Sequence, residues 1–531
     1  MSDKSSAKAN RAAAEAKELR ERKKYNIVIA VTLAVIVVLV LFTVLFSSNL
    51  FYNTTTAVKI AGDGHTDTYS VADFNYFYFT AYNTHYSQFS GYAQLLPDTS
   101  VPFDEQVCVF MGDGKSTWAD YFETQAVNSM RQISMLCAEA AADSGFTLPQ
   151  EAVDSIEETV ESLTFTAAQY NYPDLNAYLI QLYGKGMNEK IFRRDLERQA
   201  TAQAYLQYKQ DSFTYTADEL AAHYAENADD YDFFLFHYYF IPGAAVSDDA
   251  STEEDETLSA EDAMKKAEEQ AAAFESAAVD EQAYIDYAAS LNADNEDYDA
   301  DSTTLRRVQG SNLTSGYTDA VHEWLVDPAR KAGDTAVINT EEGATLPGCY
   351  VLYFMGRDNN QYLSVNGYYG FVALDAATSN VDPELEENRK EDAIRLLSTS
   401  QAQDILDDYT SLTDGDMDAF ADVMEDEDNS TLISNSGELN QVGLYDGPKE
   451  VCDWLFDPAR QEGDTTVIFV EGEGSYILYF SGTGDVYADL LSDAAMRSAD
   501  TSEWLGTQTD LYTADTQWEM FLSKNLPSLR G

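Results

Sequence analysis

Cysteine and histidine are scarce in this sequence of 531 residues, which contains four of the former and five of the latter. The four cysteines are Cys108, Cys137, Cys349 and Cys452. Because none of them forms a C-x-x-C pair, the sequence predicts neither a zinc site nor thioredoxin-like chemistry. The histidines show no i, i+4 pairing, so they do not suggest a pair of metal ligands on a helix. We expect no metal and no cofactor, while a disulfide between Cys108 and Cys137 stays open.

Basic residues are also few: 32 lysines and arginines stand against 92 aspartates and glutamates, and the formal net charge is −60. The negative electrostatic potential of such a chain repels phosphate backbones, so we expect no nucleic-acid partner. The sequence has no G-x-S-x-G, no Walker loop and no G-x-G-x-x-G between a strand and a helix. The acidic balance is typical of a soluble surface or of a surface that attracts cationic or nascent polypeptides.

One acidic stretch, "DGDMDAFADVMEDE" at 414–427, has the spacing of a calcium-binding EF-hand loop. Asp414, Asp416, Asp418 and Glu425 stand at ligand positions, but Ala419 occupies the position where the loop needs glycine. A solvated acidic start of a helix is therefore favoured over a calcium site.

The chain begins with a basic segment, residues 1–26, followed by a long apolar run. Residues 27–46 read "IVIAVTLAVIVVLVLFTVLF", with only Thr32 and Thr43 as polar interruptions. A helix of about 20 residues spans the roughly 30 Å of a bilayer core. We therefore predict an uncleaved signal anchor at 27–46 in the cell membrane, with the N-terminus cytoplasmic and the bulk of the chain extracytoplasmic. A cleaved signal peptide is the alternative, but its apolar core is usually only about 7–15 residues long.

The pattern of amino acids changes along the chain after the apolar run. Residues 47–67 resemble a linker, and 68–230 show helical periodicity from the capping-box pattern Ser70-Val71-Ala72-Asp73 onward. At 231 the segment "YDFFLFHYYFIPGA" is dense in β-formers and predicts a strand. Helices and strands alternate from there, and 488–531 return to a helical pattern.

A repeated phrase divides the alternating part into two copies. The segment "EWLVDPARKAGDTAVI" at 323–338 is similar to "DWLFDPARQEGDTTVI" at 453–468. When 321–338 is aligned with 451–468, twelve of the eighteen positions are identical. The phrase predicts the end of a helix, a stop at Asp-Pro, a turn at Gly-Asp and the start of a strand. We therefore predict a tandem duplication with one copy at 231–358 and the other at 359–487.

The pattern "x-G-D-T-x-V-I" followed by "YVLYF" or "YILYF" resembles the C-terminal half of a parvulin-type peptidyl-prolyl isomerase domain. The helical segment 68–230, with "GFTLPQEAVDS" and "FRRDLERQATAQAYL", is similar to the chaperone region of SurA/PrsA-like extracytoplasmic foldases. The resemblance implies an α+β multidomain fold: an N-terminal transmembrane helix, an all-α chaperone region, two parvulin-like α+β domains, and a helical C-terminal tail that packs on the N-terminal helices.

The resemblance also indicates where catalytic residues of an isomerase would stand. Parvulins carry a histidine at the start of the first strand and another in the last strand. His237 lies near the first position, but Tyr350 occupies the second. In the second copy the two positions hold Gly367 and Tyr476. The candidate catalytic residues are therefore His237 and Tyr350, and both domains look degenerate.

These observations favour a membrane-anchored foldase that binds unfolded or secreted polypeptides without efficient proline isomerisation. Two alternatives stay open: an active peptidyl-prolyl cis-trans isomerase that works through the first parvulin-like domain, and a cell-surface scaffold that uses these domains for protein contacts.

Overall fold

The computed structural model describes residues 30–40, 49–243, 259–295, 298–340, 346–374, 387–412 and 415–516. The chain divides into two compact units. The first unit combines residues 1–213 with 497–531, and the second contains residues 214–496. The fold is mixed α/β, and the described ranges contain three antiparallel sheets.

Only part of the apolar run near the N-terminus lies within the described residues. The helix described there covers residues 30–40, while 1–29 and 41–48 lie outside the described residues. Across the described ranges, no helix is both long and apolar enough to cross a membrane. A single-pass anchor is therefore not seen, so the predicted anchor at 27–46 and the localisation that depended on it are wrong.

The first unit is a helical bundle that carries a small sheet. Its helices are α2 (Asn49–Thr54), α3 (Val71–Gln88), α4 (Trp118–Ala142), α5 (Gln150–Gln169), α6 (Leu175–Tyr183) and α7 (Glu189–Ser212), with the short turns η1 (Ala93–Leu95) and η2 (Phe103–Glu105). The predicted capping box of α3 is confirmed. The Ser70 side chain accepts a hydrogen bond from the backbone N–H of Asp73, and the Asp73 side chain accepts one from the N–H of Ser70.

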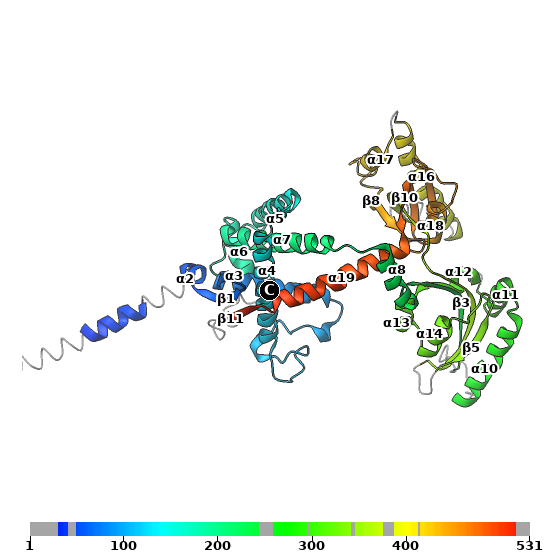
Figure 1. The fold of residues 1–531 in the computed structure, drawn as a ribbon, viewed down its shortest axis with the longest axis horizontal. Coiled ribbons are helices and arrows are strands. Elements are labelled where there is room, and N and C mark those ends of the chain that lie inside the picture. Colours follow the sequence, from blue (N-terminus) through cyan, green and yellow to red (C-terminus); the bar gives the residue numbers. More distant parts are fainter. Residues whose placement is uncertain are drawn as a thin grey trace, which may run out of the picture. The chain divides into compact units, whose positions relative to one another are not determined.

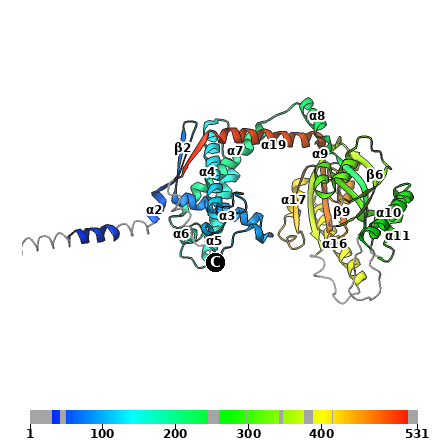
Figure 2. The same ribbon diagram turned by 90° about the horizontal axis from the view of Figure 1, so that it is seen from below.

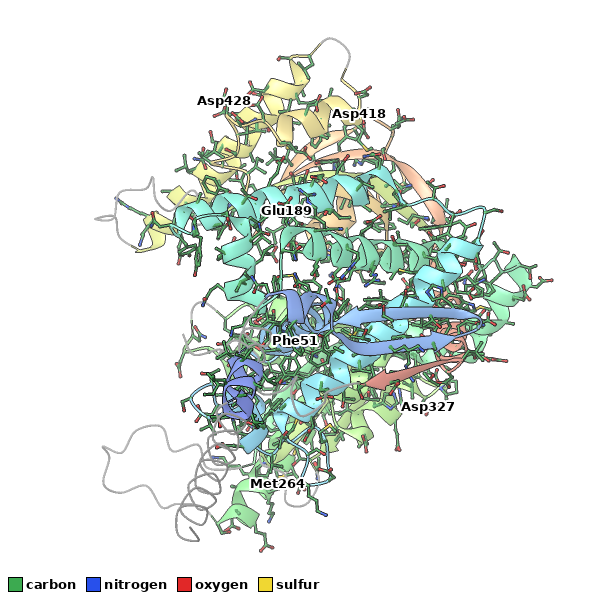
Figure 3. All side chains as sticks on the ribbon, turned by 90° about the vertical axis from the view of Figure 1, so that its left-hand side faces the viewer. Phe51, Glu189, Met264, Asp327, Asp418 and Asp428 are labelled. Atoms are coloured by element: carbon green, nitrogen blue, oxygen red, sulfur yellow. The ribbon has the colours of Figure 1, made fainter. Side chains whose placement is uncertain are left out.

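The sheet of this unit joins the two ends of the described chain. Its strands are β1 (Thr56–Gly62), β2 (His65–Ser70) and β11 (Tyr512–Thr516), in the order β11-β1-β2. Ile60 in β1 lies opposite Asp67 on one side and Ala514 on the other. Figure 3 shows the hairpin of β1 and β2 beside β11.

This sheet corrects the predicted fold class. The segment 47–67, expected to be a linker, contains β1 and the start of β2, and the C-terminal region expected to be helical ends in the strand β11. The prediction failed because β1 and β2 are short, and each edge of β1 is satisfied by a different segment, one of them about 450 residues away. A local pattern does not reveal such a pairing.

The core of the first unit lies where α3, α4 and α7 pack together beside the sheet (Figure 1). α3 buries an almost continuous aromatic run that includes Phe74, Phe77 and Tyr78. Helix α19 (Tyr487–Thr509) begins in the second unit and ends in the first. In the first unit its Trp504 packs against this core, and Arg497 Nη1 donates to the carbonyl of Asp211 over 3.0 Å.

The second unit contains two sheets with the same strand order. Its first half comprises α8 (Ala217–Glu226), α9 (Ala228–Tyr231), β3 (Phe233–Pro242), α10 (Ala260–Ala277), α11 (Glu281–Leu291), α12 (Ala300–Thr304), β4 (Leu305–Gln309), α13 (Gly310–Gly316), α14 (Asp319–Val326), β5 (Thr335–Asn339) and β6 (Gly348–Asp358). Its second half comprises β7 (Leu363–Ala373), α16 (Glu387–Thr410), α17 (Met417–Met424), β8 (Asn435–Val442), α18 (Lys449–Leu455), β9 (Thr465–Val470) and β10 (Gly474–Val486). The orders β4-β3-β6-β5 and β8-β7-β10-β9 correspond strand by strand.

Helices cover both faces of the first of these sheets. α10 and α11 pack on one face around Phe274, Tyr284 and Val351, and Figure 2 shows these two helices side by side. α13 and α14 pack on the other face around Phe236, Leu313 and Leu352. β4 and β8 were not expected from the sequence, because their residues are largely polar and lie at the sheet edge.

The repeated phrase forms the same local structure twice. Arg330 Nε donates to the carbonyl of Trp324 over 3.0 Å, and its guanidinium lies 4.0 Å from the centroid of the Trp324 ring. Arg460 and Trp454 repeat both contacts, at 3.2 and 4.2 Å. Each arginine thus caps the end of its helix and stacks on its own tryptophan, which satisfies an orphan carbonyl and adds a cation–π contact.

The glycine of the phrase forms the turn into the following strand. Gly333 and Gly463 have φ values of 92° and 88°, in the left-handed region that disfavours residues with a Cβ. A Cβ at Gly333 would meet nothing closer than the Tyr353 hydroxyl at 3.8 Å, and one at Gly463 would meet nothing within 4 Å. Conformation alone, and not crowding, therefore requires glycine here.

We expect Gly333→Ala and Gly463→Ala each to lower the free energy of unfolding of the second unit by about 1 kcal/mol, because the left-handed backbone is strained in alanine. Calorimetry of the full chain measures this as a fall of a few degrees in the transition of that unit. Gly316→Ala is the matched control: this glycine lies in α13, has no positive φ and has open space around it. An equal loss in all three variants would contradict the explanation.

Candidate functional site

The predicted catalytic residue His237 is buried in β3, and both nitrogens of its ring have hydrogen-bond partners. Its Nδ1 lies 2.8 Å from Thr304 Oγ1 in α12, and its Nε2 lies 3.3 Å from Glu281 Oε1 in α11. The imidazole has no exposed surface and packs beside the ring of Tyr284. These contacts tie strand β3 to the helices on one face of the sheet.

Tyr350, the second predicted residue, lies on the opposite face. In the antiparallel pairing of β3 and β6, His237 is opposite Tyr353, whereas Tyr350 is opposite Phe240. The Tyr350 ring packs on Tyr238 and Phe240, on the face covered by α13 and α14. Because side chains alternate between faces along a strand, the structure does not bring His237 and Tyr350 together.

The other residues that the sequence singled out have local structural contacts. Asp416 caps α17 by accepting from the N–H of Ala419, and Glu425 accepts a 2.6 Å hydrogen bond from the Tyr368 hydroxyl. Asp414 lies outside the described residues. In the described part of the chain, no three acidic, histidine or cysteine side chains form a group that suits a metal ion. Cys108 and Cys137 are both free thiols.

A groove of about 520 Å³ lies between α5 and α7 in the first unit. From the start of α5 it is lined by Pro149, Glu151, Ala152, Ser155, Ile156 and Thr159; from α7 it is lined by Leu196, Gln199, Ala200, Gln203, Ala204 and Gln207. The spacing of three and four residues places each set on one face of its helix. Beyond the groove, Arg193 Nη1 binds Glu157 Oε1 at 2.6 Å and links the two helices.

Small side chains create the groove. Ala152, Ala200 and Ala204 leave space between the helices where larger residues would fill it, and Ile156 and Leu196 add half-buried apolar surface. Along α5 only Val160 and Ala167 are fully buried, so this helix is attached over its second half. The volume falls within the range of about 300–1,000 Å³ that is usual for binding clefts.

A row of glutamines borders this apolar strip. Gln199 Oε1 accepts a 3.1 Å hydrogen bond from the Tyr76 hydroxyl, and Gln207 donates to Asp211 over 2.9 Å. Gln203 lies between them, is exposed, and has no hydrogen-bond partner within the described ranges. Each free amide offers two donors and an acceptor, which suits the backbone of a polypeptide. Glu151 is the one charged residue in the lining.

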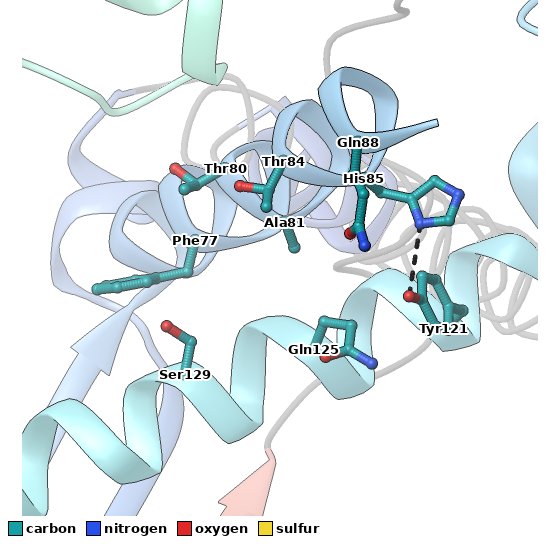
Figure 4. Close-up of a pocket in the computed structure, with 9 residues that line it drawn as sticks. All are labelled: Phe77, Thr80, Ala81, Thr84, His85, Gln88, Tyr121, Gln125 and Ser129. Carbon is teal, nitrogen blue, oxygen red and sulfur yellow. Dashed lines mark hydrogen bonds between the residues drawn. The ribbon is translucent and has the colours of Figure 1, made fainter. Parts of the chain in front are cut away.

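A second, smaller hollow of about 270 Å³ lies between α3 and α4 (Figure 4). Phe77 and Ala81 supply its apolar surface, and Gln88 and Gln125 stand on its rim. At one end the Tyr121 hydroxyl lies 3.5 Å from His85 Nδ1. Like the groove between α5 and α7, this hollow combines apolar surface with uncharged hydrogen-bonding groups.

Large apolar side chains are exposed elsewhere on the same unit. Phe165 and Tyr170 at the end of α5 are 71% and 66% exposed, and Tyr92 is 58% exposed. Exposed aromatic residues on the same unit as an apolar groove are consistent with a protein-binding surface. The sequence did not identify the groove, although alanines and glutamines at helical spacing in α7 were the visible signal.

Comparisons with known proteins give no relative for this chain: no protein-family model matches it, and no curated protein matches it.

We expect His237→Ala to lower the free energy of unfolding of the second unit by about 2–4 kcal/mol, because it creates a cavity and removes partners from Thr304 and Glu281. Tyr350→Phe should change it by less than about 0.5 kcal/mol, since the Tyr350 hydroxyl has no hydrogen bond within the described chain. Urea unfolding of the full protein, followed by circular dichroism, measures both. Equal effects would show that His237 is not the structural residue its contacts indicate.

Proposed function

We propose that this protein is a chaperone that binds unfolded polypeptides in the groove between α5 and α7 and does not depend on proline isomerisation. The observation that carries the proposal is the lining of this groove: an apolar floor of small side chains bordered by a row of glutamines. An unfolded segment places apolar side chains on such a floor while its peptide groups bond to the amides. The resemblance of 68–230 to SurA/PrsA-like chaperone regions remains a prediction that points in the same direction.

The charge of the protein supports the same class of ligand. The chain carries a net charge of −60, whereas eleven of the twelve residues that line the groove are uncharged. Acidic surface around an uncharged groove attracts polypeptides with lysine and arginine and leaves their apolar residues to bind in the groove. Clients are therefore expected to be basic, unfolded segments.

The geometry favours this function over the isomerase. An isomerase must hold a prolyl peptide group while its amide twists, and the two candidate residues for that task lie on opposite faces of a sheet. The fully buried imidazole of His237 is bonded to Thr304 and Glu281. A scaffold that binds folded partners through the second unit is the remaining alternative, and it predicts no effect on unfolded clients.

We expect the full-length protein to suppress the aggregation of reduced, unfolded lysozyme, a cationic model client, at equimolar concentration. Ala200→Leu should weaken this suppression by about tenfold, because the larger side chain fills the groove while alanine and leucine are similarly favourable in helices. Light scattering measures the effect.

Ala141→Leu is the matched control, since Ala141 is exposed on α4 and does not line the groove. Equal suppression by Ala200→Leu and the parent protein would exclude the groove as the binding site. Turnover of a prolyl tetrapeptide that His237→Ala abolishes would overturn the non-catalytic function.

A further inference from the structure

Two carboxyl groups are buried together where the start of α3 meets α7. Asp73 is 1% exposed and Asp195 has no exposed surface. Asp73 belongs to the capping box of α3 and also binds the Arg194 guanidinium. Asp195 Oδ1 lies 3.6 Å from Arg194 Nε and 3.4 Å from Arg198 Nη1. Neither arginine is fully buried, so much of the compensation for these two acids comes from partly solvated groups.

The second oxygen of Asp195 indicates a proton in this cluster. Asp195 Oδ2 is buried and has no donor among the described residues, and the carboxyl of Asp73 binds the same Arg194 guanidinium as Asp195 Oδ1. Two ionised carboxylates repel each other, whereas a carboxylic acid donates to a carboxylate. Burial, with the adjacent Asp73 carboxyl, raises the pKa of Asp195 to about 8, against the opposing effect of Arg194 and Arg198.

The other titratable groups around the pair belong to β2, α3 and α4. The Arg198 guanidinium lies over the ring of Tyr69 in β2, and the Tyr69 hydroxyl bonds to Ser134 of α4. Asp67 of β2, which pairs with His65, adds negative charge near Arg198. Burial raises the pKa of Tyr69 and of Tyr76, and raises that of Cys137 in α4 to about 11. These three groups therefore stay protonated at pH values where Asp195 ionises.

The pair is coupled to the groove through one hydrogen bond. The Tyr76 hydroxyl of α3 donates to Gln199 Oε1 of α7, and Gln199 lies one helical turn beyond Asp195 and lines the groove. Leu196, the residue after Asp195, lines it as well. Any displacement of α7 from α3 at Asp195 therefore moves two of the groove residues.

We propose that a proton retained by Asp195 beside Asp73 locks α7 against α3, and that its loss in mildly alkaline solution unlocks the groove and releases the bound polypeptide. The regulatory part of this inference rests on the proposed function, whereas the lock itself does not. Loss of the proton leaves two buried negative charges side by side, and separation of the helices lets water reach them.

The effect on stability has the same direction. The folded chain holds the Asp195 proton up to about pH 8, whereas the unfolded chain releases it near the ordinary value of 3.8. The folded state therefore binds the extra proton between these two values. The free energy of unfolding of the first unit is highest below about pH 4 with respect to this group and falls as the pH rises toward about 8.

The test compares the parent protein with Asp195→Asn in the full-length chain. The asparagine keeps the shape of the protonated acid and cannot ionise. Fluorescence anisotropy with a labelled, permanently unfolded polypeptide is measured at about pH 6.5 and about pH 9 and at fixed ionic strength. We expect the affinity of the parent protein to fall about tenfold over this range and that of Asp195→Asn to stay constant within about twofold. The same pH dependence in both proteins would overturn the proposal.

Glu197→Gln is the matched control, because Glu197 is exposed on the same helix and does not line the groove, and it should retain the pH dependence of the parent. Asp73→Asn is the second variant in case Asp195→Asn does not fold, and it should also remove the pH dependence. Hydrogen exchange of the α7 amides, compared between parent and variant at each pH, reports on the lock without a client. If no polypeptide binds at any pH, the proposed function fails; if protection of α7 in the parent does not fall relative to the variant, the lock fails.

Discussion

The pairing of β1 with β11 determines how the whole chain is organised. β1 contributes Val58 and Ile60 to the core of the first unit, and both are fully buried. A buried strand needs partners on both edges, because unpaired N–H and C=O groups are costly away from water. β2 supplies one edge locally, but the other is supplied by Tyr512–Thr516. The second unit, residues 214–496, is therefore an insertion between two parts of a single folded body.

This organisation explains which parts of the first unit are tightly held and which are open. α3, α4 and α7 pack beside the three-stranded sheet and contain most of the buried aromatic residues in the core of this unit. α5 packs mainly on α7 and α6 and buries only two residues completely. A helix held so lightly, opposite alanines of α7, leaves a groove that a continuous core would have filled. The groove is thus a consequence of where the buried contacts of α5 end.

The sequence predicted the features whose signals are local. The capping box at Ser70 and the turn at Gly333 follow from residues within a few positions of each other, and the structure contains both. The placement of His237 and Tyr350 on opposite faces could not be predicted for a different reason. They are 113 residues apart in the chain, and the face that each occupies depends on the register between β3 and β6. A shift of one residue would exchange those faces, and no local pattern specifies it. Local periodicity alone did not predict the sheet of the first unit. It also did not suffice to predict whether the apolar run forms a membrane anchor.

The burial and protonation of Asp195 likewise could not be predicted from the local sequence. In "FRRDLERQ" it stands among charged residues that suggest a solvated helix face, yet it is fully buried. Its burial arises because the capping box of α3 packs on this turn of α7, so a residue chosen to begin one helix becomes the neighbour of an acid in another. In a chain with 92 acidic residues, a second buried carboxyl beside Asp73 costs stability unless a proton is retained. Burial and the adjacent Asp73 carboxyl together raise the pKa of Asp195, so the packing of α3 against α7 determines the protonation of this acid.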